Sequence, residues 1–278
     1  MSEAKPKFLE DYPANPAEKE NYILEFNEEF QTPVLDIKKW IPYYLPQWSS
    51  RELSKPNYHF HNGNLVLKIA KDQQPWCPEF NGDVKCSSIQ TGVFSGKLGS
   101  KKGQHRFNTL CEVREEQTNI KKYTPQYGFF EIRAKALDTE SNVVALWMIG
   151  YEDKPEKSSE ICIFEIKGEN VNKESAIIGY GIRPFGDPTL QDEFHEDSFA
   201  IDVTKYHVYA VEWTPAYVDF YIDNKKVRTI HQSPNYPMQL MLNIYELPVE
   251  KVRIGKDNQY PKEFVIDYIR VFQPEKGY

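Results

Sequence analysis

Two carboxylates in one short, strand-like segment are the residues of this sequence best suited to nucleophilic and acid–base chemistry. Glu160 and Glu165 lie in the segment SSEICIFEIKGEN. Residues of a regular strand alternate between two faces, so Glu165 would point into the core with Ile161 and Ile163. An unpaired carboxylate is costly there. A one-residue bulge after Ile163 turns Glu165 to the Glu160 face and leaves both isoleucines inside, so both carboxylates face one cleft.

Two carboxylates on one face of a cleft suit the cleavage of a glycosidic bond. In a retaining glycosidase the two carboxyl groups lie about 5–5.5 Å apart. One must be ionised to attack the sugar and the other must start protonated, and repulsion between them helps to separate their pKa values. The alternative is a strand with two glutamates facing solvent, and periodicity alone favours that simpler interpretation.

The segments around this pair predict a scaffold made almost entirely of strands. Apolar and aromatic runs recur between turn signals, and no window sustains a helical period over three turns. This pattern is typical of an antiparallel sandwich or barrel. Within YVDFYIDNKKVRTI, Asp223-Asn224 separates two strand-like halves and predicts a hairpin turn.

Composition and charge favour a folded domain with a neutral ligand. The 278 residues are 40% hydrophobic and 14% aromatic, which suffices for a sizeable core. A net charge of -7 argues against a nucleic-acid or anionic-membrane partner. Residues 1–20 are polar and proline-bearing and predict an extended arm, whereas residues 21–278 show no linker and predict one domain. We expect a monomer.

The cellular compartment stays open at this stage. No stretch approaches the ~20 apolar residues of a membrane span, and the first residues lack the layout of a signal peptide. The protein is cytoplasmic if Met1 is native and extracellular if a signal was removed. The four cysteines match no zinc spacing, and Cys77 and Cys86 either bridge a loop or remain free thiols.

The carboxylate segment resembles the signature Glu-x-Asp-x-x-Glu of glycoside hydrolase family 16, the laminarinase, lichenase and carrageenase group. LEFNEEF, HNGNLVLKI, YGFFEIRAK, ALWMIG, YHVYAVEWTPAYVDFYIDNKKV, PMQLMLNIYE and VIDYIRVFQ resemble further family segments in the same order, from about residue 22 to 273. The resemblance implies a concanavalin-like jelly-roll sandwich with a concave cleft. It also implies retaining endo-hydrolysis of a β-1,3 or mixed-linkage glucan.

Two alternatives to that function remain. Residues 70–125 and 180–200, which would border the cleft, do not resemble the family segments, and this leaves a galactan or another glycan as the substrate. A lectin-like protein that binds a glycan without cutting it is the alternative from another class. An oligo- or polysaccharide is the expected partner in every case.

By this likeness Glu160 is the nucleophile and Glu165 the general acid/base. Cys162 stands where the family has aspartate. A thiol is a weak donor and usually neutral, so it replaces only part of the aspartate's role. Three outcomes follow: an active enzyme with altered pH dependence, an unusual substrate, or a binding protein without catalysis. We favour the first, because both glutamates remain.

The resemblance also indicates substrate-binding residues. Glu131 and Arg133 share a charged strand face, which the family segment places beside the catalytic strand, and Trp147 resembles the cleft tryptophan that packs against the sugar. The alternative for Glu131 and Arg133 is a cross-strand ion pair on a solvated face.

Three further candidates come from later strands, and three from loops. Asn243 and Tyr245 alternate with apolar neighbours and are predicted to line the cleft. His207 is a candidate for the cleft edge, although a structural histidine is the commoner outcome. Trp48, Arg51 and Trp76 lie in loops that would form the rim.

No cofactor is expected to be required, but a structural calcium ion is a possibility that the resemblance raises. Family members bind it on the convex side through a backbone carbonyl and an aspartate. The matching positions are Gly63 and Asp267. Hard oxygen ligands suit calcium.

Overall fold

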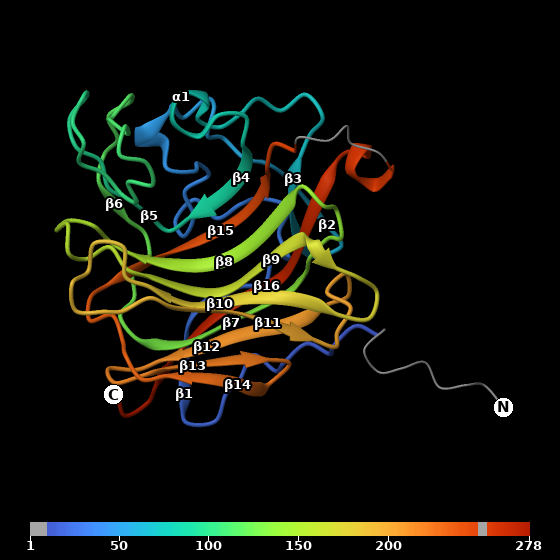
Figure 1. Cartoon of the computed structure of the whole chain (residues 1–278). Helices are drawn as coiled ribbons and strands as arrows, with labels where there is room; N and C mark the ends of the chain where they lie inside the picture. Colours follow the sequence, from blue (N-terminus) through green and yellow to red (C-terminus); the bar gives the residue numbers. More distant parts are fainter. Residues whose placement is uncertain (1–9, 250–254) are drawn as a thin grey trace.

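The computed structural model describes residues 10–249 and 255–278 and consists of two antiparallel sheets packed face to face (Figure 1). Sheet A contains β1 (Tyr22–Glu28), β2 (Asn57–His61), β3 (Asn64–Ile69), β7 (Gly128–Lys135), β12 (His207–Trp213), β13 (Val218–Ile222), β14 (Lys225–Ile230) and β16 (Lys262–Pro274). Sheet B contains β4 (Lys85–Gln90), β8 (Asn142–Gly150), β9 (Glu160–Val171), β10 (Ala176–Arg183), β11 (Glu193–Phe199) and β15 (Met238–Glu246).

The strand order places β9 among the inner strands of its sheet and joins the two ends of the chain in the other sheet. Sheet B runs β11-β10-β9-β8-β15-β4, and sheet A runs β14-β13-β12-β7-β16-β3-β2, with β1 paired to β16. The short strands β5 (Gly92–Val93) and β6 (Ile120–Lys121) form a separate ribbon. The helical elements are α1 (Pro78–Asn81) and the 3-10 turns Pro46–Trp48 and Gly255–Asn258. The predicted all-β jelly-roll sandwich is confirmed.

Alternation along the strands of sheet B separates the sandwich core from the outer face. On β8, Val144, Leu146 and Met148 belong to the core between the sheets. Trp147 and Ala145 belong to a second apolar cluster on the other face of the strand. Period-two alternation therefore sends side chains to two faces of sheet B. Both faces are buried here, because loops cover part of the outer side.

The predicted bulge lies on β9. Leu146 pairs with Phe164 and Trp147 pairs with Cys162, so Ile163 is an extra residue between them. Phe164 turns inward with Ile163 and stacks on Tyr209 at 4.4 Å between ring centroids. The bulge is thereby confirmed, and it leaves Glu160, Cys162 and Glu165 on the outer side of sheet B.

Two other local features follow from side-chain chemistry. Asp223 and Asn224 have φ of 50° and 60°, as expected for the tight turn that joins β13 and β14, so the predicted hairpin is confirmed. Strand β11, with the sequence EFHEDSF, was not predicted because it is mostly polar. It lies at the edge of sheet B, where charged side chains discourage pairing with other chains.

Loop residues from the segments 44–54, 76–84 and 107–113 form a wall over one part of sheet B. In Figure 1 the loops around α1, β4 and β5 stand above β8 and β15. Trp48 and Trp76 are fully buried in this wall, which corrects the expectation that they form a rim. All four cysteines are buried free thiols, so Cys77 and Cys86 are not bridged.

Within the described ranges, no helix is both long and apolar enough to cross a membrane.

Candidate active site

A cavity of about 360 Å³ opens on the outer face of sheet B. Strands β8, β9 and β15 contribute Trp147, Glu160, Cys162, Glu165 and Tyr245 to its lining. Loops and the end of β10 add Tyr44, His105, Arg183 and Phe185. The bulge therefore brings both carboxylates of the predicted pair to one cavity with aromatic walls.

Glu160 is the more buried carboxylate of the pair, with 12% of its side chain exposed. Burial raises the pKa of Glu160 to about 8, the charges of Glu165 and Asp192 add to this effect, and Arg183 opposes it. The Arg183 Nε atom lies 3.9 Å from the Glu160 Oε1 atom. Glu160 is thus protonated at neutral pH more readily than we expected for a nucleophile, and Arg183 is the group that favours its ionised form.

Glu165 lies in a more open and more polar environment. Its side chain is 27% exposed, and the Lys167 Nζ atom lies 3.8 Å from the Glu165 Oε1 atom. Lys167 also donates to the Glu196 carboxylate at 2.7 Å. Contact with solvent suits a group that must exchange protons with water.

Cys162 lies between these residues on the same strand face. Its side chain is buried, and burial raises the pKa of the thiol well above its usual value, with further contributions from the charges of Glu160 and Glu165. The thiol is therefore neutral and adds no charge to the pair. This is a clear difference from an ionised aspartate at the same place.

The aromatic side chains of the cavity are held by short hydrogen bonds. The Trp147 Nε1 atom donates to Asn243 Oδ1 at 2.6 Å, and Tyr245 donates its hydroxyl to Tyr44 at 2.8 Å. Trp147 and Tyr245 line the cavity as predicted. Asn243 was predicted to line the cleft, and this is wrong: it is fully buried outside the cavity lining, and its contact orients the Trp147 indole.

A family model described as glycosyl hydrolases family 16 matches residues 54–269, more than half of the chain and the whole site apart from Tyr44. The chain belongs to glycoside hydrolase family 16. The family has a retaining mechanism, and its enzymes generally require no cofactor.

Three similar proteins illustrate the range of this family. A GlcNAcα1-4Gal releasing endo-β-galactosidase from Clostridium perfringens is 37% identical, with a TM-score of 0.83, over 97% of this chain and 66% of that chain. A laminarinase catalytic domain from Thermotoga petrophila has a TM-score of 0.63 at 20% identity, over 91% of this chain and 98% of that chain, and shows the shared fold. A β-glucanase from Acetivibrio thermocellus is 26% identical over 52% of this chain and 42% of its own length. This chain thus spans less than two thirds of the first and third of these proteins.

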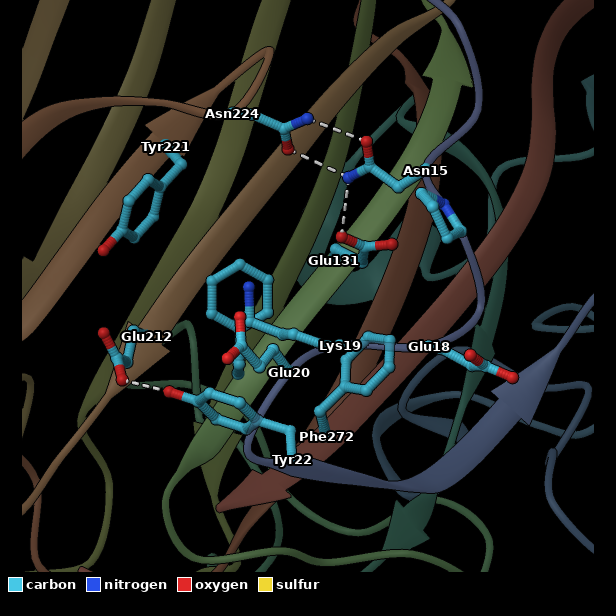
Figure 2. Close-up of a pocket in the computed structure, with 12 residues that line it drawn as sticks. Asn15, Glu18, Lys19, Glu20, Tyr22, Glu131, Glu212, Tyr221, Asn224 and Phe272 are labelled. Atoms are coloured by element: carbon cyan, nitrogen blue, oxygen red, sulfur yellow. Dashed lines mark hydrogen bonds between the residues drawn. The ribbon is translucent and has the colours of Figure 1, made fainter. Parts of the chain in front are cut away.

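Glu131 and Arg133 do not lie beside the strand that carries Glu160 and Glu165, where the family resemblance led us to expect them. Both lie on β7, whose neighbours are β12 and β16 in sheet A, so the expected position beside the catalytic strand is wrong. Their face is the outer side of sheet A, where Glu131 accepts a hydrogen bond from Asn15 at 3.0 Å (Figure 2). Arg133 donates to the backbone oxygen of Tyr12. The charged face therefore binds residues of the N-terminal arm instead of sugar.

We expect Glu131→Ala to destabilise this family 16 chain without impairing catalysis. The substitution removes one of the two side-chain partners of the Asn15 amide and the carboxylate 3.6 Å from Arg270, which is itself buried. The cost is about 2 kcal/mol, or a few degrees in Tm. Thermal unfolding and kcat/KM measured on the same preparation check this. Glu18→Ala is the control, because it removes an exposed carboxylate that lines the same surface pocket as Asn15 and Glu131 (Figure 2). A loss of kcat/KM at unchanged Tm would restore the original sugar-binding interpretation.

His207 is a structural residue and does not reach the cleft, contrary to its place among the expected substrate-binding residues. It begins β12 in sheet A and is 2% exposed. Its Nδ1 atom lies 2.7 Å from Asp223 Oδ2, and its Nε2 atom lies 3.1 Å from the backbone oxygen of Asp202. Both ring nitrogens are therefore used to hold the β13–β14 turn and the loop before β12.

The residues expected to hold calcium do not fit that ion. The Asp267 carboxylate accepts a hydrogen bond from Arg133 Nη1 at 2.5 Å, so a guanidinium already compensates its charge. Gly63 lies in the turn between β2 and β3, with φ of 73°. Within residues 10–249 and 255–278, no group of three or more histidine, cysteine or acidic residues is arranged to hold a metal.

Six residues of the cavity were not predicted from the sequence: Tyr44, His105, Ala145, Lys167, Arg183 and Phe185. Arg183 of β10 pairs with Glu160 of β9. The register between these two strands is therefore what identifies Arg183 as a neighbour of Glu160. Tyr44, His105 and Phe185 come from irregular segments, which carry no periodicity from which an orientation can be inferred.

On a substrate with an activated aryl leaving group, which departs without a proton from Glu165, we expect kcat/KM to rise as the pH increases through about 8, because a nucleophile must be ionised and the pKa of Glu160 is raised to about 8. Arg183→Gln removes the charge that lowers this pKa, so the rising limb moves to higher pH and the rate at pH 7 falls severalfold. A pH–rate profile measures both. Arg228→Gln, which affects an ion pair with Asp197, is the control. A limb that stays in place in Arg183→Gln would contradict this assignment.

Proposed function

We propose that this protein is a retaining endo-glycosidase in which Glu160 is the nucleophile and Glu165 the general acid/base. The observation that carries the proposal is the bulge at Ile163, which turns two glutamates of one strand into the same cavity. The aromatic walls formed by Trp147 and Tyr245 suit the apolar faces of sugar rings.

Each carboxyl group has a defined task in the two steps. In the first step the Glu160 carboxylate attacks the anomeric carbon while Glu165 donates its proton to the leaving oxygen, which forms a glycosyl ester and frees the aglycone. In the second step Glu165 takes a proton from water, and the resulting hydroxide displaces Glu160 with overall retention. Arg183 promotes the first step because it favours the ionised form of Glu160.

The substrate that we propose is a glycan cut at an internal β-galactosyl bond. Its support is the 37% identity with the endo-β-galactosidase over nearly the whole of this chain, including loops that do not resemble the laminarinase segments. The β-1,3 or mixed-linkage glucan that the sequence suggested is the second candidate, and the β-glucanase relative favours it.

A panel of purified glycans tests this proposal. Mucin O-glycans, galactans, laminarin and lichenan are each incubated with the protein, and new reducing ends are counted. We expect release from a galactose-containing glycan, with the β-anomer as the first product in NMR spectra. Release from laminarin or lichenan alone would favour the glucan candidate, and binding without release from any glycan would favour a lectin-like protein.

The thiol at position 162 gives a further prediction. Cys162→Asp places a carboxylate in a buried site next to Glu160 and Glu165, and repulsion raises the pKa of the nucleophile further. On the substrate with an activated aryl leaving group, we expect the rising limb of the pH–rate profile to move to higher pH and the rate at neutral pH to fall. Cys162→Ser, which stays neutral, is the matched control. Three superimposable profiles would show that this position does not tune the pair.

A further inference from the structure

A pocket of about 460 Å³ lies on the outer face of sheet A, across the sandwich from the catalytic cavity (Figure 2). Side chains from the arm segment 15–20 form one wall, and side chains of β1, β7, β12, β13, the β13–β14 turn and β16 form the rest. We call this space the arm pocket. Its volume is typical of a small-molecule site, and neither Glu160 nor Glu165 lines it.

The lining of the arm pocket is acidic. It contains four carboxylates, those of Glu18, Glu20, Glu131 and Glu212. Among the described residues of the lining, Lys19 is the single cation, so the net charge is -3 when all five groups are ionised. Within the part of the chain that the structure describes, no three acidic, histidine or cysteine residues are arranged to hold a metal. Carboxylates spread around a pocket suit an extended cation better than a compact metal ion.

The Lys19 side chain shows which kind of cation the pocket accepts. Its Nζ atom lies 3.7 Å from the centroid of the Phe129 ring and 5.4 Å from that of the Tyr22 ring. Aromatic ring faces attract an ammonium group placed over them. Burial lowers the pKa of Lys19, and the charges of Glu131 and Glu212 oppose this effect. An alkylammonium group of the chain itself therefore already lies in the arm pocket, between aromatic rings and carboxylates.

The charge of Glu131 is incompletely compensated. This residue is 3% exposed, and its Oε2 atom accepts a hydrogen bond from the Asn15 amide at 3.0 Å. The Oε1 atom accepts none of normal geometry from the described residues, although Tyr268 is close and the Arg270 Nη1 atom lies 3.6 Å away. A buried acceptor without a donor requires an explanation. A cation in the pocket provides one, because it offsets the negative potential of this carboxylate.

We propose that the arm pocket binds an alkyl diammonium ion, such as a short diamine, whose ammonium groups lie among the carboxylates and whose methylene chain packs on the aromatic rings. Primary ammonium groups fit best, because they donate hydrogen bonds to carboxylates such as those of Glu20 and Glu212. The Tyr22 hydroxyl donates to the Glu212 carboxylate at 2.5 Å and holds it at the pocket wall (Figure 2). The bound ion bridges the arm and sheet A, so it stabilises the folded chain.

Calorimetric titration and thermal unfolding of the full chain with 1,4-diaminobutane test the site at constant ionic strength. We expect saturable binding and a rise in Tm with diamine concentration. The neutral 1,4-butanediol should have neither effect, and tetramethylammonium, which has no N–H donor, should bind more weakly than the diamine. Equal effects of the diol and the diamine would overturn the proposal. A larger rise in Tm with calcium chloride would also overturn it, because the site would then be one for a metal ion.

Two variants should move the diamine affinity in opposite directions. Glu20→Gln removes an exposed carboxylate of the lining and should weaken binding by about threefold. Lys19→Met removes the resident ammonium but keeps an unbranched side chain, so it should strengthen binding by about threefold. An unchanged affinity in Lys19→Met would contradict the proposed position of the ligand.

Glu10→Gln is the matched control for Glu20→Gln. It removes an exposed carboxylate of the same arm that does not line the pocket. Both variants have the same net charge, so their comparison separates a specific site from the general attraction of cations to an acidic protein. The affinity of Glu10→Gln should equal that of the parent protein. Equal losses in both variants would overturn the proposal.

Glu160→Gln separates the arm pocket from the catalytic cavity, which also contains carboxylates. This variant should bind the diamine as tightly as the parent protein does. A loss of binding would place the diamine in the catalytic cavity and overturn the proposal. Because no glycan is present in these titrations, failure of the diamine site leaves the proposed glycosidase function to its own tests.

Discussion

Replacing Glu160 by glutamine is expected to lower turnover by at least about 10³-fold, which corresponds to about 4 kcal/mol of barrier. Glutamine keeps the shape of the side chain and removes the carboxylate that we propose as the nucleophile. The cavity is otherwise unchanged, because Glu160 contributes to β9 through backbone pairing with Ile149 and Arg183. Glycan binding and Tm should therefore be preserved. Reducing-end release and calorimetric binding measure the two effects separately.

Glu169→Gln is the matched control for this variant. Glu169 lies on the same strand but does not line the catalytic cavity, so its amide variant should retain wild-type turnover. If Glu160→Gln keeps more than about a tenth of the wild-type rate, about 1.4 kcal/mol of barrier, Glu160 is not the nucleophile.

The second large effect is expected from Glu165→Ala. Loss of the proton donor should lower the rate on natural glycans by about 10²–10⁴-fold, because the leaving oxygen then departs as an unprotonated alkoxide. An activated aryl leaving group departs without a proton, so the rate of the first step on a substrate that carries one should fall far less. Added azide should raise turnover of the aryl substrate, because this small nucleophile needs no general base.

The comparison of the two substrates is what assigns the role of Glu165. Glu196→Ala is a suitable control, because it removes the other carboxylate that contacts Lys167 but lies at the edge of sheet B outside the catalytic cavity. Equal losses on glycan and aryl substrate in Glu165→Ala, without azide rescue, would remove Glu165 from the acid role.

The shared orientation of Glu160 and Glu165 was predictable, because regular strand alternation and the burial of apolar side chains conflict at Glu165. Isoleucines at 161 and 163 require the core, and Glu165 cannot join them, so the chain must shift its alternation between Ile163 and Glu165. The Asp223-Asn224 turn was predictable for a similar reason, since its residues tolerate the positive φ that a tight hairpin needs. In both cases short-range chemistry allowed one solution.

The remainder of the site depends on long-range pairing that local patterns do not encode. Alternation on β7 separated its charged face from its apolar face, but it did not reveal that the strand belongs to sheet A, so Glu131 and Arg133 were assigned to the wrong surface. The cavity walls formed by His105 and Phe185 come from loops. Their position is set by ring contacts between residues distant in the sequence.

The pairing of β1 with β16 has a consequence for how the protein is made. Residues 262–274 supply the common neighbour of β1, β3 and β7, and Tyr268 and Arg270 of that strand also hold Asn15 of the arm. During synthesis the amino-terminal segments leave the ribosome long before this partner exists. Sheet A therefore cannot close until residues 262–274 have been made, and release of a chain that ends before residue 262 leaves three strands exposed to aggregation.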